Sequence, residues 1–207
     1  MSRPTLEFWF EFASTYSYLA ASRIERLAEA EGVEVRWRPF LLGPIFAAQG
    51  WNTSPFNLYP AKGRHMWRDM EREAEAFGVP LQRPDLFPQN SLLAARIALV
   101  GAQEGWCAAF AGALFRAEFA ERRSIDEPAV IRAALDEVGR DPEATIATAQ
   151  GDENRARLRA QNEEAARLGI FGAPSFIAPD GELFWGNDRL ERALAWVRGR
   201  SPAPSGQ

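Results

Sequence analysis

The period of the hydrophobic pattern changes twice near the start of the chain. Over residues 6–12 Leu, Phe, Phe and Phe alternate with Glu, Trp and Glu, and a period of two predicts a strand. Apolar residues then recur at helical spacing over residues 18–28, and Gly32 provides a good helix stop. Alternation returns over residues 33–40. This strand–helix–strand order predicts two parallel strands joined by a right-handed crossover.

The middle of the chain predicts helices and no clear strand. Residues 41–60 are rich in Gly and Pro, which indicates a loop. Asp126 stands just before Pro128 and Asp141 directly before Pro142, as an N-cap residue stands before a first helical turn. Helical patterns cover residues 62–77, 89–104, 106–121, 126–138, 142–149 and 152–168. We therefore expect a helical insertion domain over residues 43–168.

Strand signals return after Pro174. Residues 175–178 and 182–185 flank an Asp-Gly pair, which predicts a short hairpin. A final helix is expected after Gly186, and the Pro-, Ser- and Gly-rich residues 201–207 predict a flexible tail. The order β-α-β, helical insertion, β-β-α is the thioredoxin plan. We therefore expect an α/β, thioredoxin-like fold, with residues 1–42 and 169–200 forming the thioredoxin-like domain.

Composition and charge exclude several classes of function. The chain of 207 residues is 46% hydrophobic and 25% charged, which is ordinary for a globular protein. Its net charge of −4 gives no basic field for nucleic acid or an anionic membrane. One cysteine, Cys107, and one histidine, His65, exclude an intramolecular disulfide and a conventional His/Cys metal cluster. With no secretory signal and no apolar run long enough to cross a bilayer, we expect a cytoplasmic protein.

The chain lacks thiols where a thioredoxin-type redox enzyme has them. Such an enzyme carries Cys-x-x-Cys where the first strand meets the first helix, and Ser14 and Ser17 occupy those places here. Phe171-Gly-Ala-Pro174 precedes the hairpin, where such chains keep a cis-proline facing the active site. A disulfide oxidoreductase is excluded because the chain has no dithiol. The scaffold must borrow a thiol, and we expect that thiol to come from glutathione.

Three motifs occur in the order of one known family. They are Phe10-Glu-Phe-Ala-Ser14-Thr-Tyr-Ser-Tyr-Leu-Ala20, Phe171-Gly-Ala-Pro174 and Trp185-Gly-Asn-Asp-Arg-Leu190, of which the last is the most specific. On these motifs, over residues 5–198, the chain resembles the 2-hydroxychromene-2-carboxylate isomerases. These belong to the DsbA-like group, which also contains the kappa-class glutathione transferases. One departure is Thr15, because the family usually has proline after its active-site serine.

The resemblance implies a role for five residues. Ser14, at a helix N-terminus, would donate a hydrogen bond to a bound thiolate, whose charge the helix dipole also favours. A cis bond at Pro174 would leave the carbonyl and N–H of Ala173 exposed beside Ser14, where a peptide can pair with them. Asn187 would hold the γ-glutamyl carboxylate of glutathione, and Asp188 its ammonium. Ser14, Asn187 and Asp188 also have a structural reading, because each is a preferred helix N-cap.

For the remaining candidate site residues, the residue type alone gives less support for a functional role. Asn52 and Lys62 occupy places where the family's glutathione contacts often fall, although a turn-forming asparagine and a solvated lysine explain them equally well. His65 and Ser17 are expected on helix faces, and Cys107 is expected to be a small buried side chain. The tryptophans considered for an apolar pocket that suits a flat aromatic substrate are Trp9, Trp51, Trp67 and Trp185.

The resemblance implies a glutathione-dependent cis-trans isomerase of aromatic degradation. Its substrate would be 2-hydroxychromene-2-carboxylate or a similar intermediate, converted to the trans-o-hydroxybenzylidenepyruvate isomer through reversible thiolate addition, with glutathione as a cofactor. Two alternatives stay open: a kappa-class-like transferase that consumes glutathione, and a non-enzymatic thioredoxin-like binding module with a shallow, exposed Ser14. The family also implies a homodimer, and neither nucleic acid nor membrane is expected as a partner.

Overall fold

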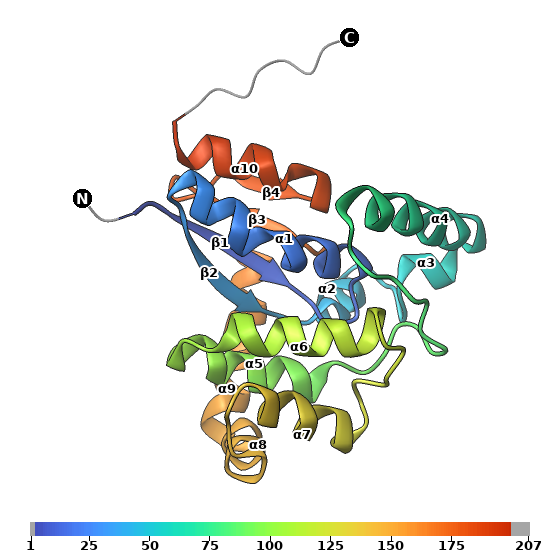
Figure 1. The fold of residues 1–207 in the computed structure, drawn as a ribbon, viewed down its shortest axis with the longest axis vertical. Helices are drawn as coiled ribbons and strands as arrows, with labels where there is room; N and C mark the ends of the chain where they lie inside the picture. The colour runs from blue at the N-terminus through green and yellow to red at the C-terminus, as the bar shows by residue number, and fades with distance from the viewer. Residues whose placement is uncertain (1–2, 200–207) are drawn as a thin grey trace.

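A four-stranded mixed sheet forms the centre of the molecule (Figure 1). The computed structural model describes residues 3–199. Strands β1 (Thr5–Phe10) and β2 (Glu34–Pro39) pair in parallel, and β3 (Ser175–Ile177) runs antiparallel to both β1 and β4 (Leu183–Trp185). The strand order is β2-β1-β3-β4. The predicted parallel pair and the predicted hairpin are both confirmed.

Helices account for most of the remaining chain. Their bounds are α1 Thr15–Glu31, α2 Leu42–Ala48, α3 Pro55–Leu58, α4 Pro60–Phe77, α5 Leu92–Glu104, α6 Cys107–Phe119, α7 Pro128–Glu137, α8 Pro142–Gln150, α9 Asp152–Arg167 and α10 Leu190–Val197, with a 3-10 turn, η1, at Asn187–Arg189. The helix α1 ends at Gly32 with φ of 64°, as predicted, because glycine adopts this left-handed conformation without a steric penalty. In Figure 1, α1 and α10 lie against the sheet and α5 to α9 form a block below it.

Two local predictions are wrong and one is confirmed. Residues 41–60, predicted as loop, contain the short helices α2 and α3, and Ser54 caps the second by accepting the Phe56 N–H at 3.3 Å. The N-cap of α7 is Glu127, because Asp126 instead accepts a hydrogen bond from the Ser124 hydroxyl at 2.5 Å. Asp141 caps α8 as predicted, accepting the Ala144 N–H at 2.9 Å.

Aromatic side chains of β1 form the centre of the apolar core. On one face Phe8 and Phe10 stack with centroids 5.3 Å apart, and Phe10 lies 6.0 Å from Phe115 of α6. On the other face Trp9 packs edge-on against Phe40 at 6.0 Å. Side chains of the sheet and of the middle helices therefore share one core.

Because the sheet and the middle helices share one core, the division of the chain into a thioredoxin-like domain and an insertion domain at residues 43–168 stays a prediction. Cys107 is buried within this core, as expected, and burial raises the pKa of its thiol. Between residues 3 and 199, no helix is both long and apolar enough to span a bilayer. The predicted tail at residues 201–207 lies outside the described residues.

Candidate active site

A cavity of about 1120 Å³ lies beside the N-terminus of α1. Its lining comes from the turn before α1, the α2–α3 segment, α4, the loop before α5 and the two loops that flank the β3–β4 hairpin. Ligand pockets typically measure about 300–1,000 Å³, so this one has room for two small molecules together. In the described part of the chain, no group of three or more His, Cys, Asp or Glu side chains is placed to hold a metal ion.

Ser14 joins two segments that are far apart in the sequence. Its hydroxyl oxygen caps α1 by accepting the Ser17 N–H at 3.2 Å, and its hydroxyl donates to the Ala173 carbonyl at 3.0 Å. The Ala173–Pro174 bond is cis, which confirms the prediction. Ser14 is only 9% exposed but lines the cavity with Ala173. The strand–helix junction and the cis-proline loop therefore meet at one wall of the cavity.

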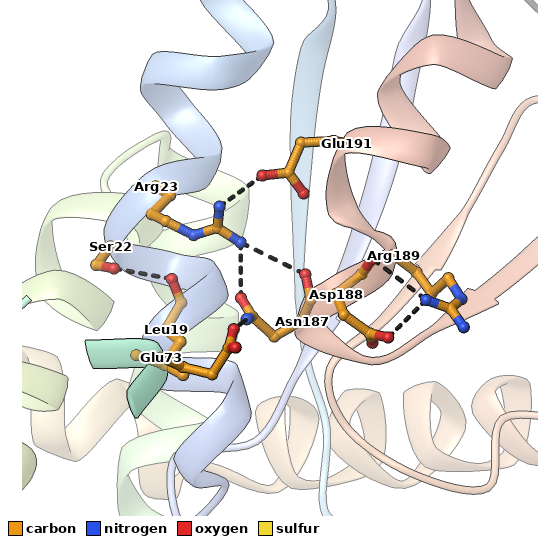
Figure 2. Close-up of polar contacts among 8 residues, drawn as sticks. All are labelled: Leu19, Ser22, Arg23, Glu73, Asn187, Asp188, Arg189 and Glu191. Carbon is orange, nitrogen blue, oxygen red and sulfur yellow. Dashed lines mark hydrogen bonds and ion pairs between the residues drawn. The ribbon is translucent and has the colours of Figure 1, made fainter. Parts of the chain in front are cut away.

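Asn187 lines the cavity but is held by protein groups on both sides (Figure 2). Its side-chain oxygen accepts a hydrogen bond from Arg23 Nη2 at 2.9 Å, and its amide nitrogen donates to Glu73 Oε2 at 3.4 Å. Arg23 Nη1 binds Glu191 at 2.6 Å. The Asn187 side chain thus fixes the start of η1 against α1 and α4, a positional role that its sequence context did not reveal.

Asp188 is exposed and pairs with its neighbour. Its carboxylate lies 2.5 Å from Arg189 Nη1 (Figure 2). Asp69 and Glu73 of α4 line the same cavity, so these three carboxylates face it from two elements, η1 and α4. Tyr16 donates a hydrogen bond to Asp69 at 2.8 Å, and burial together with this bond raises the pKa of Tyr16. This side of the cavity favours a positively charged ligand group.

Lys62 and Asn52 are exposed residues of the cavity lining. Lys62 Nζ lies 5.9 Å from the Phe56 ring centroid, and within residues 3–199 no carboxylate approaches it to 4 Å. A cation without an acidic partner in this wall favours an anionic ligand group. His65, exposed on α4 as expected, lines the same wall.

Two of the four candidate tryptophans line the cavity. Trp51 and Trp185 do, and Trp185 packs on Phe171 with centroids 4.8 Å apart. Of the other two candidates, Trp9 is fully buried in the core, and Trp67 does not line the cavity but packs behind Phe87, which does. The sequence could not separate them, because the residues near a tryptophan in the chain do not show whether its ring lies in the core or in a cavity wall.

Glu11 is a cavity residue that the sequence pattern concealed. The alternating pattern of residues 6–12 gave no sign of a cavity, but the strand ends at Phe10 and the chain turns, with the Ser14 N–H donating to the Glu11 carbonyl at 3.0 Å. The side chain is only 6% exposed and accepts a short hydrogen bond from the Ser91 hydroxyl. Burial raises the pKa of Glu11 to about 7, although hydrogen bonds from Ser91 and from the backbone of Ala13 lower it.

Glu118 of α6 is a second buried carboxyl in the same region. It is fully buried, and neither of its oxygens has a hydrogen-bond partner within the described residues. Burial raises the pKa of Glu118 well above its usual range, and the charges of Glu11 and Asp126 raise it further. Glu118 does not line the cavity, whereas Glu11 does.

Comparison with known proteins agrees with this architecture. A family model described as the DSBA-like thioredoxin domain matches residues 5–195. A 2-hydroxychromene-2-carboxylate isomerase from Sphingobium xenophagum is 30% identical over 189 residues, covering 90% of this chain and 94% of that protein. Glutathione S-transferase kappa 1 of Caenorhabditis elegans is 34% identical over 85 residues, covering 41% of this chain and 37% of that protein.

A solved structure supports the same assignment. The structure of a 2-hydroxychromene-2-carboxylate isomerase matches this chain with a TM-score of 0.81 and 28% identity, covering 93% of this chain and 94% of that one. The expected thioredoxin-like fold of the DsbA type is therefore confirmed. The chain belongs to the DSBA-like thioredoxin domain family, within which it is similar over nearly its whole length to 2-hydroxychromene-2-carboxylate isomerases.

Proposed function

We propose that this protein is a glutathione-dependent isomerase that acts on 2-hydroxychromene-2-carboxylate or a similar intermediate of aromatic degradation. The observation that carries the proposal is the Ser14 hydroxyl, which caps α1 and meets the cis-proline loop at the wall of a large cavity. The names of the relatives, matched over about nine-tenths of the chain, support the reaction class.

The residues of the cavity fit glutathione. Asp188, together with Glu73 of the same cavity lining, suits the ammonium of its γ-glutamyl end. Lys62 and Asn52 suit a carboxylate, either of the tripeptide or of the substrate. The backbone of Ala173 suits pairing with the peptide, beside Ser14 and the cis-Pro174. Asn187 then acts by fixing η1, because its side-chain groups already bond to Arg23 and Glu73.

Ser14 would act on the ionisation of the bound thiol. Glutathione supplies a thiolate that adds reversibly to a conjugated carbon of the substrate. Ser14 donates to the Ala173 carbonyl, so stabilising a thiolate requires its O–H to rotate away from that carbonyl. A hydrogen bond to a charged group contributes about 1.5–3 kcal/mol, which is about one pKa unit or more. Free N–H groups in the first turn of α1 favour the same charge.

A kappa-class-like transferase is the second candidate, and the match to the Caenorhabditis elegans protein favours it. Its glutathione site would use the same residues, so stoichiometry must separate the two activities. A non-enzymatic binding module would have a shallow, exposed Ser14, whereas Ser14 here is 9% exposed beside a large cavity. We further propose a cytoplasmic homodimer, as the family resemblance implies.

The test is turnover of 2-hydroxychromene-2-carboxylate with substoichiometric glutathione, followed by a count of free thiols. We expect isomerisation with the thiol conserved, and a rate that falls on the order of tenfold or more in Ser14→Ala. Ser22→Ala is the matched control, because Ser22 is an exposed serine of α1 whose hydroxyl, within residues 3–199, bonds only to the Leu19 carbonyl (Figure 2). Loss of free thiol during turnover would establish the transferase instead, and an unchanged rate in Ser14→Ala would remove Ser14 from the mechanism.

A further inference from the structure

The carboxyl of Glu11 and the hydroxyl of Ser14 come from one turn and line one cavity. The turn is closed by the Ser14 N–H, which donates to the Glu11 carbonyl at 3.0 Å. Ser91, which also lines the cavity, donates a short hydrogen bond to Glu11 Oε1. The position of the carboxyl is therefore fixed from two segments that are 80 residues apart.

No positive charge accompanies this carboxyl. Glu118 of α6 lies close enough for the charge of Glu11 to raise its pKa, and the charge of Asp126, which precedes α7, raises the pKa of Glu118 as well. The loop before α5 contributes the neutral Ser91 and Gln89, and Gln89 is already bonded to the Ile125 N–H at 2.7 Å. Throughout residues 3–199 no Lys, Arg or His nitrogen lies within 4 Å of the carboxylate of Glu11 or of Glu118. Burial thus favours the protonated form of Glu11 up to near-neutral pH, where its pKa of about 7 lies.

We propose that Glu11 is the proton donor and acceptor of this cavity, transferring its carboxyl proton to the substrate oxygen on which negative charge develops and recovering it afterwards. In the forward step a thiolate would supply the electron pair of a new bond to the conjugated carbon, a pair of the conjugated system would move onto the oxygen, and the Glu11 O–H bond would break as a substrate O–H bond forms. In the reverse step the pair returns to the conjugated system and the proton returns to the carboxylate. Protons and electrons balance over the cycle. The inference rests on the proposed isomerase function.

Two other proton-carrying groups nearby, Glu118 and Tyr16, suit this task less well. Glu118 lies outside the lining of the cavity. Tyr16 donates a hydrogen bond to Asp69, and its pKa is raised, so it keeps its proton at neutral pH. General acid–base catalysis is most effective when the pKa of the group lies near the working pH, as that of Glu11 does.

The first test compares two buried carboxyls by the same substitution. In Glu11→Gln we expect kcat to fall on the order of a hundredfold, since general acid–base catalysis contributes about 10²–10⁴-fold. The limb of the pH–rate profile near neutral pH should disappear, while ultraviolet absorbance still shows glutathione bound as thiolate. In Glu118→Gln we expect kcat to stay within about threefold of wild type, because this side chain is outside the cavity.

A second variant tests the titration itself. The Ser91 hydrogen bond lowers the pKa of Glu11, so Ser91→Ala should move the pH–rate limb to higher pH. In protein without glutathione or substrate, infrared spectra should show a protonated-carboxyl band that titrates near neutral pH in wild type and is absent in Glu11→Gln. A purely structural role for Glu11 predicts none of these changes in the pH profile.

The results separate the inference from the function on which it rests. Wild-type turnover, with full kcat and an unchanged pH profile in Glu11→Gln, overturns the role of Glu11 and leaves the isomerase standing. Loss of glutathione binding in Glu11→Gln also overturns it, because Glu11 then serves the binding site. A wild-type protein that binds glutathione as thiolate but isomerises no substrate overturns the proposed function and this inference together.

Discussion

Two clusters with buried charged side chains each contribute one residue, Asn187 or Glu11, to the lining of the same cavity, and they differ in how their polar atoms are satisfied. The Arg23 cluster consists of Arg23, Asn187, Glu191 and Phe77. The Arg23 guanidinium bonds to Asn187 at 2.9 Å and to Glu191 at 2.6 Å (Figure 2). It also lies 3.7 Å over the Phe77 ring. Only its Nε has no partner within the described chain. The charge of Arg23 is therefore paired through both of its Nη atoms.

The acidic pair, Glu11 and Glu118, shows the opposite arrangement. Glu11 has hydrogen bonds from Ser91 and Ala13 but no cation, and Glu118 has no partner among residues 3–199. A buried charge is stable when it is paired, whereas an unpaired carboxyl takes up a proton instead. The comparison therefore assigns a structural role to the paired arginine and a proton-holding role to the unpaired acids.

Removal of the Arg23 side chain should have the largest effect on stability. In Arg23→Ala the Asn187 oxygen loses its donor inside the protein, and the packing against Phe77 is lost. Together these losses should lower the free energy of unfolding by about 3–4 kcal/mol. Urea denaturation measures the effect, with Arg26→Ala as the control, since Arg26 is exposed on the same helix. A loss below about 1 kcal/mol would show that the paired cluster is not structural.

The pH dependence of stability should be the next largest effect. Folding raises the pKa of Glu11 from 4.5 to about 7, so the folded state binds this proton more tightly than the unfolded state. The resulting stability is fully present below pH 4.5 and is lost as pH rises through about 7. The amount is about 3 kcal/mol, at about 1.4 kcal/mol per pKa unit.

Urea unfolding at a series of pH values checks this slope. Glu11→Gln should have a flatter profile than wild type across the interval, and the slope that persists in it belongs to Glu118, whose pKa is also raised. Parallel profiles for the variant and wild type would mean that Glu11 titrates equally in the folded and unfolded states, contrary to the comparison.

Replacement of Glu118 should have the smallest effect, and its sign should be opposite. Methionine has a similar length, fills irregular space and carries no unsatisfied oxygen, so Glu118→Met should stabilise the fold by about 1–2 kcal/mol at neutral pH. Glu163→Met on an exposed face of α9 is the control and should change stability by less than about 0.5 kcal/mol. Destabilisation by Glu118→Met, measured by thermal unfolding, would indicate a partner for this carboxyl in solution.

Much of the fold could be predicted from the sequence because its signals are local. The period-two pattern of β1, the stop at Gly32 and the Asp-Gly turn at residues 180–181 each depend on near neighbours. The short helices α2 and α3 were missed because their few residues carry too little periodic signal among glycines and prolines. The N-cap at Glu127 was missed because Asp126 has a competing partner in Ser124.

The candidate site likewise contains some residues that local sequence motifs reveal and others that only distant contacts place. Ser14 and Pro174 belong to motifs that can be recognised locally, and the cis bond at Pro174 is confirmed. Glu11 could not be found from its pattern, because it becomes a cavity residue only where the strand ends and a loop 80 residues away supplies Ser91. The bonds between Asn187 and Arg23 join residues 164 apart, and no local spacing contains that information.

The central claim is that the cavity wall formed by Ser14 and the cis-proline loop binds glutathione and ionises its thiol. We would measure it by calorimetric titration of glutathione in buffers of different ionisation enthalpy, which reports both affinity and proton release, for wild type and Ser14→Ala. The account predicts micromolar-range binding with proton release in wild type, and weaker binding or loss of proton release in Ser14→Ala. Absence of detectable binding at millimolar glutathione would contradict it.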